Sequence, residues 1–392
     1  MIVGARRVIL TARMAVVLGC ACAVVAGCGV PRGGEGTRPR DDEIAWPGKG
    51  GGFAFWGDGG EYVYAVSVNP RVLEVFKWSD ATLKLEKEVP LERNVMCVQL
   101  LSSARYVARS WHPAVSETNE PIYGPDSAQK TVSILEIKDL KSGRRQTTCA
   151  LLSDGIDHNE LSKPSGNGKH VVFWRSVFSS RLGAEPHSEV RFARIDTKTG
   201  EVEWVGAVTG RTGADATVRT VIPSNEGAYI AVAGWDNGVV VLDVAEKKVL
   251  WARGYETDCD YIAFTPDSSV VYAGGMVGLV YGMEVKTGKI LSKWPATESG
   301  KEEYGHRIST ISVSPDGRFV AAGTGPEGQV FVFSTKTGKL VKLLDHAGST
   351  ILITSFSPGS KRLASVAAGR IKIWTMPEDN GPAAQNAAPK DK

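Results

Sequence analysis

The sequence has few of the residues, and none of the motifs, that commonly carry enzyme chemistry. Its 392 residues include only six histidines and six cysteines. It has no Walker-type phosphate loop, no Gly-x-Ser-x-Gly and no His-Glu-x-x-His, and no Cys-x-x-Cys follows residue 28. These absences argue against the common nucleotide hydrolases, serine hydrolases and zinc proteases, and we expect neither a cofactor nor a metal.

The chain also lacks an excess of charge of either sign. Its formal net charge is +3, and Arg6, Arg7 and Arg13 are the only charged residues in 1–27. Removal of that segment would take away those three charges and leave a net charge of zero. A balanced chain has no broad electrostatic footprint for nucleic acid, so we expect no nucleic-acid partner.

A long amphipathic helix is missing as well. The 44 glycines are spread along the chain in turn-like clusters, and apolar residues make up 42% of the sequence. That combination favours many short strands around a substantial core.

The N-terminus has the layout of a secretory signal peptide. Residues 1–13 carry three arginines and no acid, and Met14–Gly27 is an uncharged run too short to span a membrane comfortably. The run ends in Val25-Ala26-Gly27-Cys28, which resembles a bacterial lipobox. That resemblance implies lipidation of Cys28, export, and a lipid anchor in the bacterial cell envelope, on the periplasmic or outer face.

Three other interpretations of this segment stay open. Cys28 would be an ordinary cysteine if the signal peptide were of the plain type. Val17-Leu18-Gly19-Cys20 is a second, weaker lipobox match, and Arg6-Arg7 resembles a twin-arginine signal.

Composition divides the chain into four segments: a signal peptide (1–27), a flexible tether (28–42), a body (43–377) and a disordered tail (378–392). The body contains Cys97, Cys149 and Cys259, which we interpret as buried apolar side chains rather than disulfide partners.

The body repeats one unit seven times. A turn such as Ser314-Pro315-Asp316-Gly317 precedes a branched or aromatic strand that ends in small residues. The strands after the turn begin at Tyr62, Tyr106, His170, Tyr229, Val270, Phe319 and Arg362. A unit of 40–45 residues has the length of a propeller blade, and two units carry insertions.

A second turn fixes the phase of the repeat. Thr-Lys-Thr-Gly or a close variant ends at Gly200, Gly288 and Gly338, between two alternating strands. Each unit is therefore four strands, a to d, with the first turn between a and b and the second between c and d. The last unit stops after a strand c at Trp374, and we expect the segment 43–46 to supply its missing strand d and close the ring.

These turns resemble two known groups of propellers. The Ser-Pro-Asp-Gly turn is similar to that of the WD40 family, and the Lys-Thr-Gly turns look like those of quinoprotein-type propellers. The resemblance implies an all-β, seven-bladed β-propeller. Standard WD40 blades hold a hydrogen-bonded tetrad of His, Ser or Thr, Asp and Trp. Here His306, His346 and Trp374 alone match it, while Asp196 and Asp243 occupy the expected Trp position of their blades.

The longest insertions indicate a partner-binding face. Strand direction places loops a–b and c–d on one face and loops b–c and d–a on the other. Ser110–Lys130 in blade 2 and Phe178–Ser188 in blade 3 are both expected b–c loops, beside the b–c turn of blade 4. Aromatic and arginine side chains often anchor interfaces, so we predict a protein or peptide partner at Trp111, His112, Tyr123, Arg181, His187 and Trp235.

Two rival functions use the same fold. Five histidines map to this face (His112, His158, His187, His306 and His346), and Asp154, Asp157, Glu160, Asp258 and Asp260 lie near its centre. They allow a lactonase-like or quinoprotein-like enzyme with its site in the central funnel. The chain also resembles the propeller lipoprotein of outer-membrane assembly machinery, although eight blades are expected there.

Overall fold

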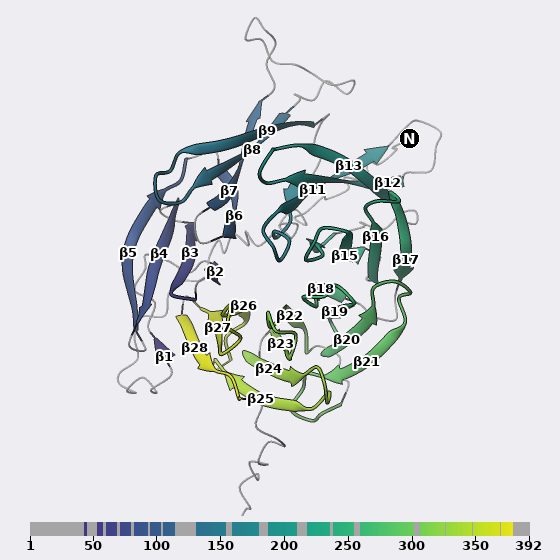
Figure 1. Cartoon of the computed structure of the whole chain (residues 1–392). Coiled ribbons are helices and arrows are strands. Elements are labelled where there is room, and N and C mark those ends of the chain that lie inside the picture. The colour runs from purple at the N-terminus through teal and green to yellow at the C-terminus, as the bar shows by residue number, and fades with distance from the viewer. Residues whose placement is uncertain are drawn as a thin grey trace, which may run out of the picture.

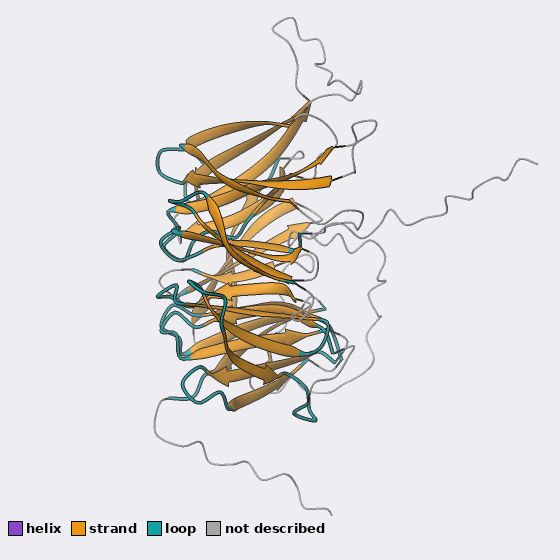
Figure 2. Ribbon diagram, turned by 90° about the vertical axis from the view of Figure 1, so that its right-hand side faces the viewer, coloured by secondary structure: helices purple, strands orange, loops and turns teal. Residues whose placement is uncertain are grey.

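The computed structural model describes residues 43–44, 53–57, 60–68, 71–79, 82–92, 95–102, 105–113, 131–153, 159–179, 187–209, 218–235, 238–254, 259–301, 306–325, 327–346, 348–368 and 370–378. Within these ranges the regular structure is entirely β (Figure 2), and there is no helix that could span a membrane. The strands are β1 (Glu43–Ile44), β2 (Phe53–Trp56), β3 (Tyr62–Val68), β4 (Arg71–Ser79), β5 (Thr82–Pro90), β6 (Val95–Ser102), β7 (Arg105–Pro113), β8 (Thr131–Asp139), β9 (Arg145–Ser153), β10 (Asn159–Leu161), β11 (His170–Ser179), β12 (His187–Asp196), β13 (Val202–Thr209), β14 (Thr220–Pro223), β15 (Tyr229–Trp235), β16 (Gly238–Asp243), β17 (Lys248–Arg253), β18 (Cys259–Phe264), β19 (Val270–Gly275), β20 (Leu279–Glu284), β21 (Ile290–Pro295), β22 (Ile308–Val313), β23 (Phe319–Thr324), β24 (Gln329–Ser334), β25 (Leu340–Asp345), β26 (Ile351–Phe356), β27 (Arg362–Ala367) and β28 (Arg370–Thr375).

The strands form seven antiparallel sheets of four strands each, arranged in a ring (Figure 1). Six sheets follow the chain directly, from β2–β5 in blade 1 to β22–β25 in blade 6. Strand a of each blade lies near the axis and strand d at the rim (Figure 1). The prediction of a seven-bladed propeller is confirmed. Strand b begins at the predicted residue in six blades and one residue earlier, at Arg105, in blade 2.

The seventh blade is closed by the N-terminal strand. Its order is β1-β28-β27-β26, and Glu43 and Ile44 of β1 pair with Lys372 and Ile371 of β28. The predicted closure is therefore confirmed. Pairing of β1 covers part of an edge that an open ring would leave exposed.

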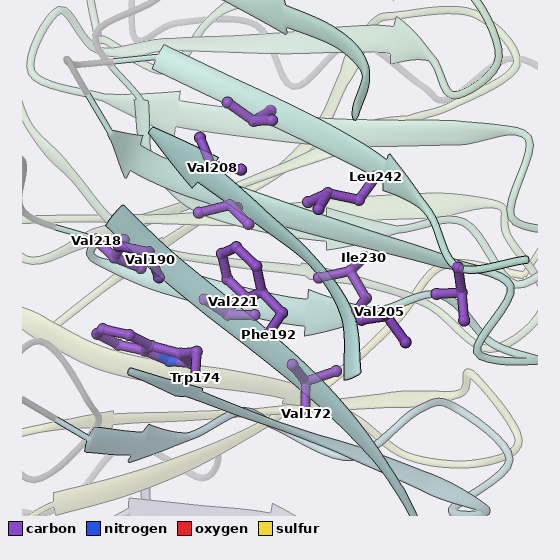
Figure 3. Packing of buried hydrophobic residues seen from close by; sticks show 13 residues of the cluster. Val172, Trp174, Val190, Phe192, Val205, Val208, Val218, Val221, Ile230 and Leu242 are labelled. Carbon is purple, nitrogen blue, oxygen red and sulfur yellow. The ribbon is translucent and has the colours of Figure 1, made fainter. Parts of the chain in front are cut away.

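Apolar packing between neighbouring blades holds the ring together. The described residues form seven clusters of buried apolar side chains, and each cluster joins two adjacent blades. Figure 3 shows the cluster between blades 3 and 4, where Trp174 and Phe192 face Val221, Ile230 and Leu242. Burial of such side chains is the main favourable term in folding.

Hydrogen bonds within the a–b turn of blade 6 explain its sequence. The Ser314 hydroxyl donates to Asp316 Oδ1 at 2.6 Å and accepts from the Phe319 backbone N–H at 2.9 Å. Gly317 supplies a φ of +73°, which favours glycine. In blades 5 and 7 a serine occupies this left-handed position, and its hydroxyl accepts a backbone N–H from the preceding blade: Ser268 from Asn225 at 3.1 Å, and Ser360 from Asp316 at 3.1 Å.

In blades 2, 3 and 4 an aspartate at the end of strand c stabilises the c–d turn. Asp196 Oδ1 accepts the backbone N–H groups of Lys198 and Thr199 at 2.7 and 2.8 Å. The expectation that Asp196 and Asp243 stand at the Trp position is wrong by one residue. Trp374 pairs with the second residue of strand b, and the residues with that pairing in blades 3 and 4 are Ile195 and Leu242.

In blades 3, 5 and 6 the glycine of the c–d turn also makes room for the neighbouring blade. A Cβ on Gly288 would lie 2.7 Å from the indole of Trp251, which extends from strand d of blade 4. A Cβ on Gly338 would lie 2.7 Å from Trp294 Nε1 on strand d of blade 5. A Cβ on Gly200 would lie 2.5 Å from Thr147 Cγ2 of blade 2. The recurring glycine is therefore required by packing between blades as well as by its positive φ.

The b–c hairpins of blades 2 and 3 are longer than the sequence indicated. β7 extends to Pro113 and β8 begins at Thr131, so the b–c connection of blade 2 is 114–130 rather than Ser110–Lys130. In blade 3 the connection is 180–186 rather than Phe178–Ser188. Trp111, His112 and His187 are therefore strand residues.

Blade 7 contains a buried polar relay. The Trp374 indole N–H donates to the Ser365 hydroxyl at 2.7 Å, and His346 Nε2 lies 2.6 Å from the same oxygen. The His346 and Trp374 rings contact edge to face at 6.0 Å. These contacts hold His346, which lies in the connection before β26, against Ser365 of β27 and Trp374 of β28. His346 therefore has a structural role.

His170 should make stability depend on pH. Its ring packs against Gly227 of the next blade, and its Nδ1 is buried without a hydrogen-bond partner among the described residues. Burial, and then the Arg194 guanidinium, lower the pKa of His170 from its usual 6.5. Because the folded pKa lies below the unfolded pKa, this contribution is fully present above about pH 6.5 and is lost as the pH falls below that value and through the lower folded pKa.

We therefore expect the urea midpoint of wild type to fall more than that of His170→Gln between pH 7.5 and 5.5. Equilibrium urea unfolding at the two pH values measures the difference. Equal falls would show that His170 does not contribute.

Candidate functional site

The face that carries the b–c and d–a connections is where the inner strands begin. Several strands a are bulged after their first residue: the register shifts between Cys259 and Tyr261 in β18, and between Ile308 and Thr310 in β22. A bulge re-aims a side chain. In blades 5 and 6 the bulged residues are Asp260 and Ser309.

Asp260 joins two arginines from the flanking blades. Arg307, which precedes β22, donates from Nη2 to Asp260 Oδ2 at 2.6 Å. Arg219, which precedes β14, lies with Nε 3.7 Å from Asp260 Oδ1. The Asp260 side chain is 11% exposed, and the two arginines are 30% and 36% exposed. Two guanidinium groups around one carboxylate leave a net positive charge at the ends of three adjacent inner strands.

Neighbouring groups hold this cluster in place. The Thr220 hydroxyl donates to the Asp260 carbonyl at 2.8 Å, and the Ser309 hydroxyl donates to the Ile351 carbonyl at 2.6 Å. Burial raises the pKa of the Tyr261 phenol, and Arg307 opposes this only in part. Tyr261 is therefore a neutral hydrogen-bonding group at ordinary pH and no candidate base.

The two histidines of this face whose side chains are described, His306 and His346, have separate partners. His306 Nδ1 lies 3.4 Å from Glu327 Oε1, and His346 belongs to the blade 7 relay. Within the described ranges no three His, Cys, Asp or Glu side chains are grouped as metal ligands would be. His158, Asp154, Asp157 and Asp258 lie outside the described residues.

The predicted partner residues are brought to this face by their backbones. Trp111 and His112 lie near the end of β7, His187 begins β12, and Trp235 ends β15. The side chains of these four residues are outside the described part of the structure. Tyr123, Arg181 and Cys28 lie wholly outside the described residues. The roles of these residues in partner binding and lipidation stay predictions.

Arg219 and Arg307 were not among the predicted site residues. Each immediately precedes a strand a, in Val218-Arg219-Thr220 and His306-Arg307-Ile308. The position directly before strand a could have identified both arginines from the repeat alone. Cys259 is fully buried, as expected.

The fold and the repeated turns define a WD40-like seven-bladed β-propeller. Residues 298–334, which include β22, β23 and β24, match the WD domain, G-beta repeat family. That match covers part of the chain, from the end of blade 5 through most of blade 6.

Similarity to curated proteins extends further along the chain. It is 25% identical over 166 residues to the periodic tryptophan protein 2 homolog of Dictyostelium discoideum, covering 41% of this chain and 17% of that protein. It is 44% identical over 66 residues to meiotic recombination protein rec14 of Schizosaccharomyces pombe, covering 17% and 21%. It is 24% identical over 220 residues to autophagy-related protein 16 of Arabidopsis thaliana, covering 46% and 42%. The matches thus span less than half the length of each of these relatives.

Proposed function

We propose that this protein is a non-catalytic scaffold that holds a protein or peptide partner on the b–c and d–a face of its propeller. The observation that carries the proposal is the Arg219–Asp260–Arg307 cluster. It presents two guanidinium groups with partly exposed side chains, on the face that also carries the long connections of blades 2 and 3. Arginine is a frequent anchor of interfaces because its planar fork matches carboxylates.

The same proposal includes attachment to the bacterial cell envelope. The lipobox-like Val25–Cys28 and the polar segment that follows support a lipid anchor with a tether. The anchor would keep the propeller near a membrane surface and leave its faces available to a partner.

A quantitative capture experiment tests the partner face. Wild type and an Arg219→Gln/Arg307→Gln variant are expressed in the native host and cross-linked, and their partners are quantified by mass spectrometry. We expect at least a tenfold loss of a reproducible partner in the variant and after replacement of 114–130 by a short Gly-Ser linker.

Lys336→Gln/Lys339→Gln is the matched control. It removes the same charge from the exposed c–d turn of blade 6, on the opposite face, and should capture the partner as wild type does. Capture that is unchanged in both face variants would contradict the proposal.

Metabolic labelling with a radioactive fatty acid tests the anchor. Cys28→Ser should abolish labelling and release the protein from the membrane fraction, whereas Cys20→Ser should leave both unchanged. Labelling that persists in Cys28→Ser would exclude lipidation at that residue.

A further inference from the structure

A pocket opens on the a–b and c–d face, opposite the proposed partner face. It has a volume of about 330 Å³ and lies at the seam between blades 6 and 7. Its lining comes from the a–b turns of the two blades and from the chain after β28: Arg318, Gly359, Lys361, Arg362, Thr375, Met376, Pro377 and Glu378. The pocket thus combines three cations and one carboxylate with backbone and apolar surface.

The two arginines are held in place by other groups. Arg318 Nε donates to Asp316 Oδ2 at 2.6 Å, and its guanidinium lies 5.1 Å from the centre of the Phe319 ring. The Arg362 guanidinium lies 5.3 Å from the centre of the Trp78 ring, in blade 1. A guanidinium stacked on an aromatic face keeps its N–H edge available for a carboxylate.

The charges in the pocket are not balanced by the described residues. Burial tends to raise the pKa of Asp316, but hydrogen bonds from Ser314 and Arg318 outweigh burial and lower it, so Asp316 is ionised and neutralises Arg318. Lys361 and Arg362 are exposed, and neither forms an ion pair with a described carboxylate. Only Glu378 in the lining opposes them.

The wall beside the cations indicates the size and character of a ligand. Met376 is buried, with its backbone N–H donating to the Lys361 carbonyl at 2.9 Å, and Pro377 follows it on the surface. A volume near 300 Å³ is at the lower end of the range for ligand sites. It suits two or three side chains of a peptide that carries carboxylates next to an apolar residue.

We propose that this pocket is a second docking site, which takes a short acidic peptide segment of a partner. The carboxylates contact Lys361 and Arg362, and an apolar side chain packs on Met376 and Pro377. The site is separate from the Arg219–Asp260–Arg307 cluster, because it lies on the other face of the ring.

Fluorescence anisotropy with the full chain tests this site. The probe is a labelled acetyl-Glu-Asp-Leu-Asp-Glu peptide, and its amide counterpart acetyl-Gln-Asn-Leu-Asn-Gln is the control ligand. We expect saturable binding of the acidic peptide alone, weakened by added salt. Lys361→Gln/Arg362→Gln should weaken binding at least tenfold, and Lys336→Gln/Lys339→Gln, with the same charge removed from the same face, should not.

Other outcomes would overturn the proposal. An equal loss of binding in both double variants would indicate nonspecific attraction. Displacement of the peptide by inorganic phosphate at the peptide's own concentration would indicate a phosphate site. Tighter binding after truncation behind Glu378 would show that residues 379–392 are the natural occupant. Because Arg362 contacts Trp78, Lys361→Glu serves as a second variant that keeps this contact, and it should weaken binding in the same way.

Discussion

Gly338→Ala is expected to cost about 3 kcal/mol of unfolding free energy. Its φ of +67° is unfavourable for alanine by about 1–2 kcal/mol. The added Cβ would also lie 2.7 Å from Trp294 Nε1. Trp294 has little room to yield, because its ring is stacked between Tyr272 and Phe333 at 5.3 and 5.5 Å. Overpacking of this kind adds about 1–3 kcal/mol.

Gly143→Ala separates the two contributions to that cost. Gly143 also has a positive φ, of +69°, but a Cβ there would have nothing within 4 Å. We expect Gly143→Ala to lose only the backbone part, about 1–2 kcal/mol. Urea unfolding of both variants measures the difference. Equal losses would mean that the c–d glycine does not serve packing between blades.

Ser365→Ala is expected to destabilise the protein by about 2–3 kcal/mol. The serine is fully buried, and its hydroxyl contacts two ring nitrogens, one on Trp374 and one on His346. Its removal leaves the Trp374 indole N–H without a partner and takes a contact from His346. A buried polar group that loses its partner costs about 1–3 kcal/mol.

Ser312→Ala is the matched control for the relay. Its hydroxyl lies 2.9 Å from the Thr354 hydroxyl, in a half-buried position on an inner strand. Water can replace this contact, so we expect a loss below about 1 kcal/mol. Thermal unfolding of the two variants compares them. A smaller loss for Ser365→Ala than for Ser312→Ala would contradict the structural role of the relay.

The blades were predictable because their turns require particular residues. In blades 3 to 7 a serine or threonine hydroxyl recurs five residues before strand b, and a residue with positive φ recurs two residues before it. The start of strand b was found to within one residue in every blade. The closure by residues 43–44 followed from counting strands, since the last unit stopped after strand c.

The remaining details depend on contacts between blades, which one sequence does not reveal. The hydroxyl of Ser365 connects His346 to Trp374, although its sequence neighbours give no sign of this role. Asp260 meets Arg219 and Arg307 because a bulge re-aims it toward residues of two other blades. The ends of β7 and β12 were misplaced because nothing in the local sequence marks where cross-strand pairing stops.

The arrangement of the seven blades depends on closure of the ring by β1 on β28. A cross-link between these two strands tests that closure most directly. Glu43 and Lys372 are cross-strand partners, so Glu43→Cys/Lys372→Cys should form an intramolecular disulfide under mild oxidation. The bond would close nearly the whole chain into a loop and accelerate migration on a non-reducing gel, reversibly with reductant. We expect this shift for that pair and none for Glu43→Cys/Lys248→Cys, whose second site lies on strand d of blade 4. No shift for the first pair, or equal shifts for both, would contradict closure of the ring by β1 on β28.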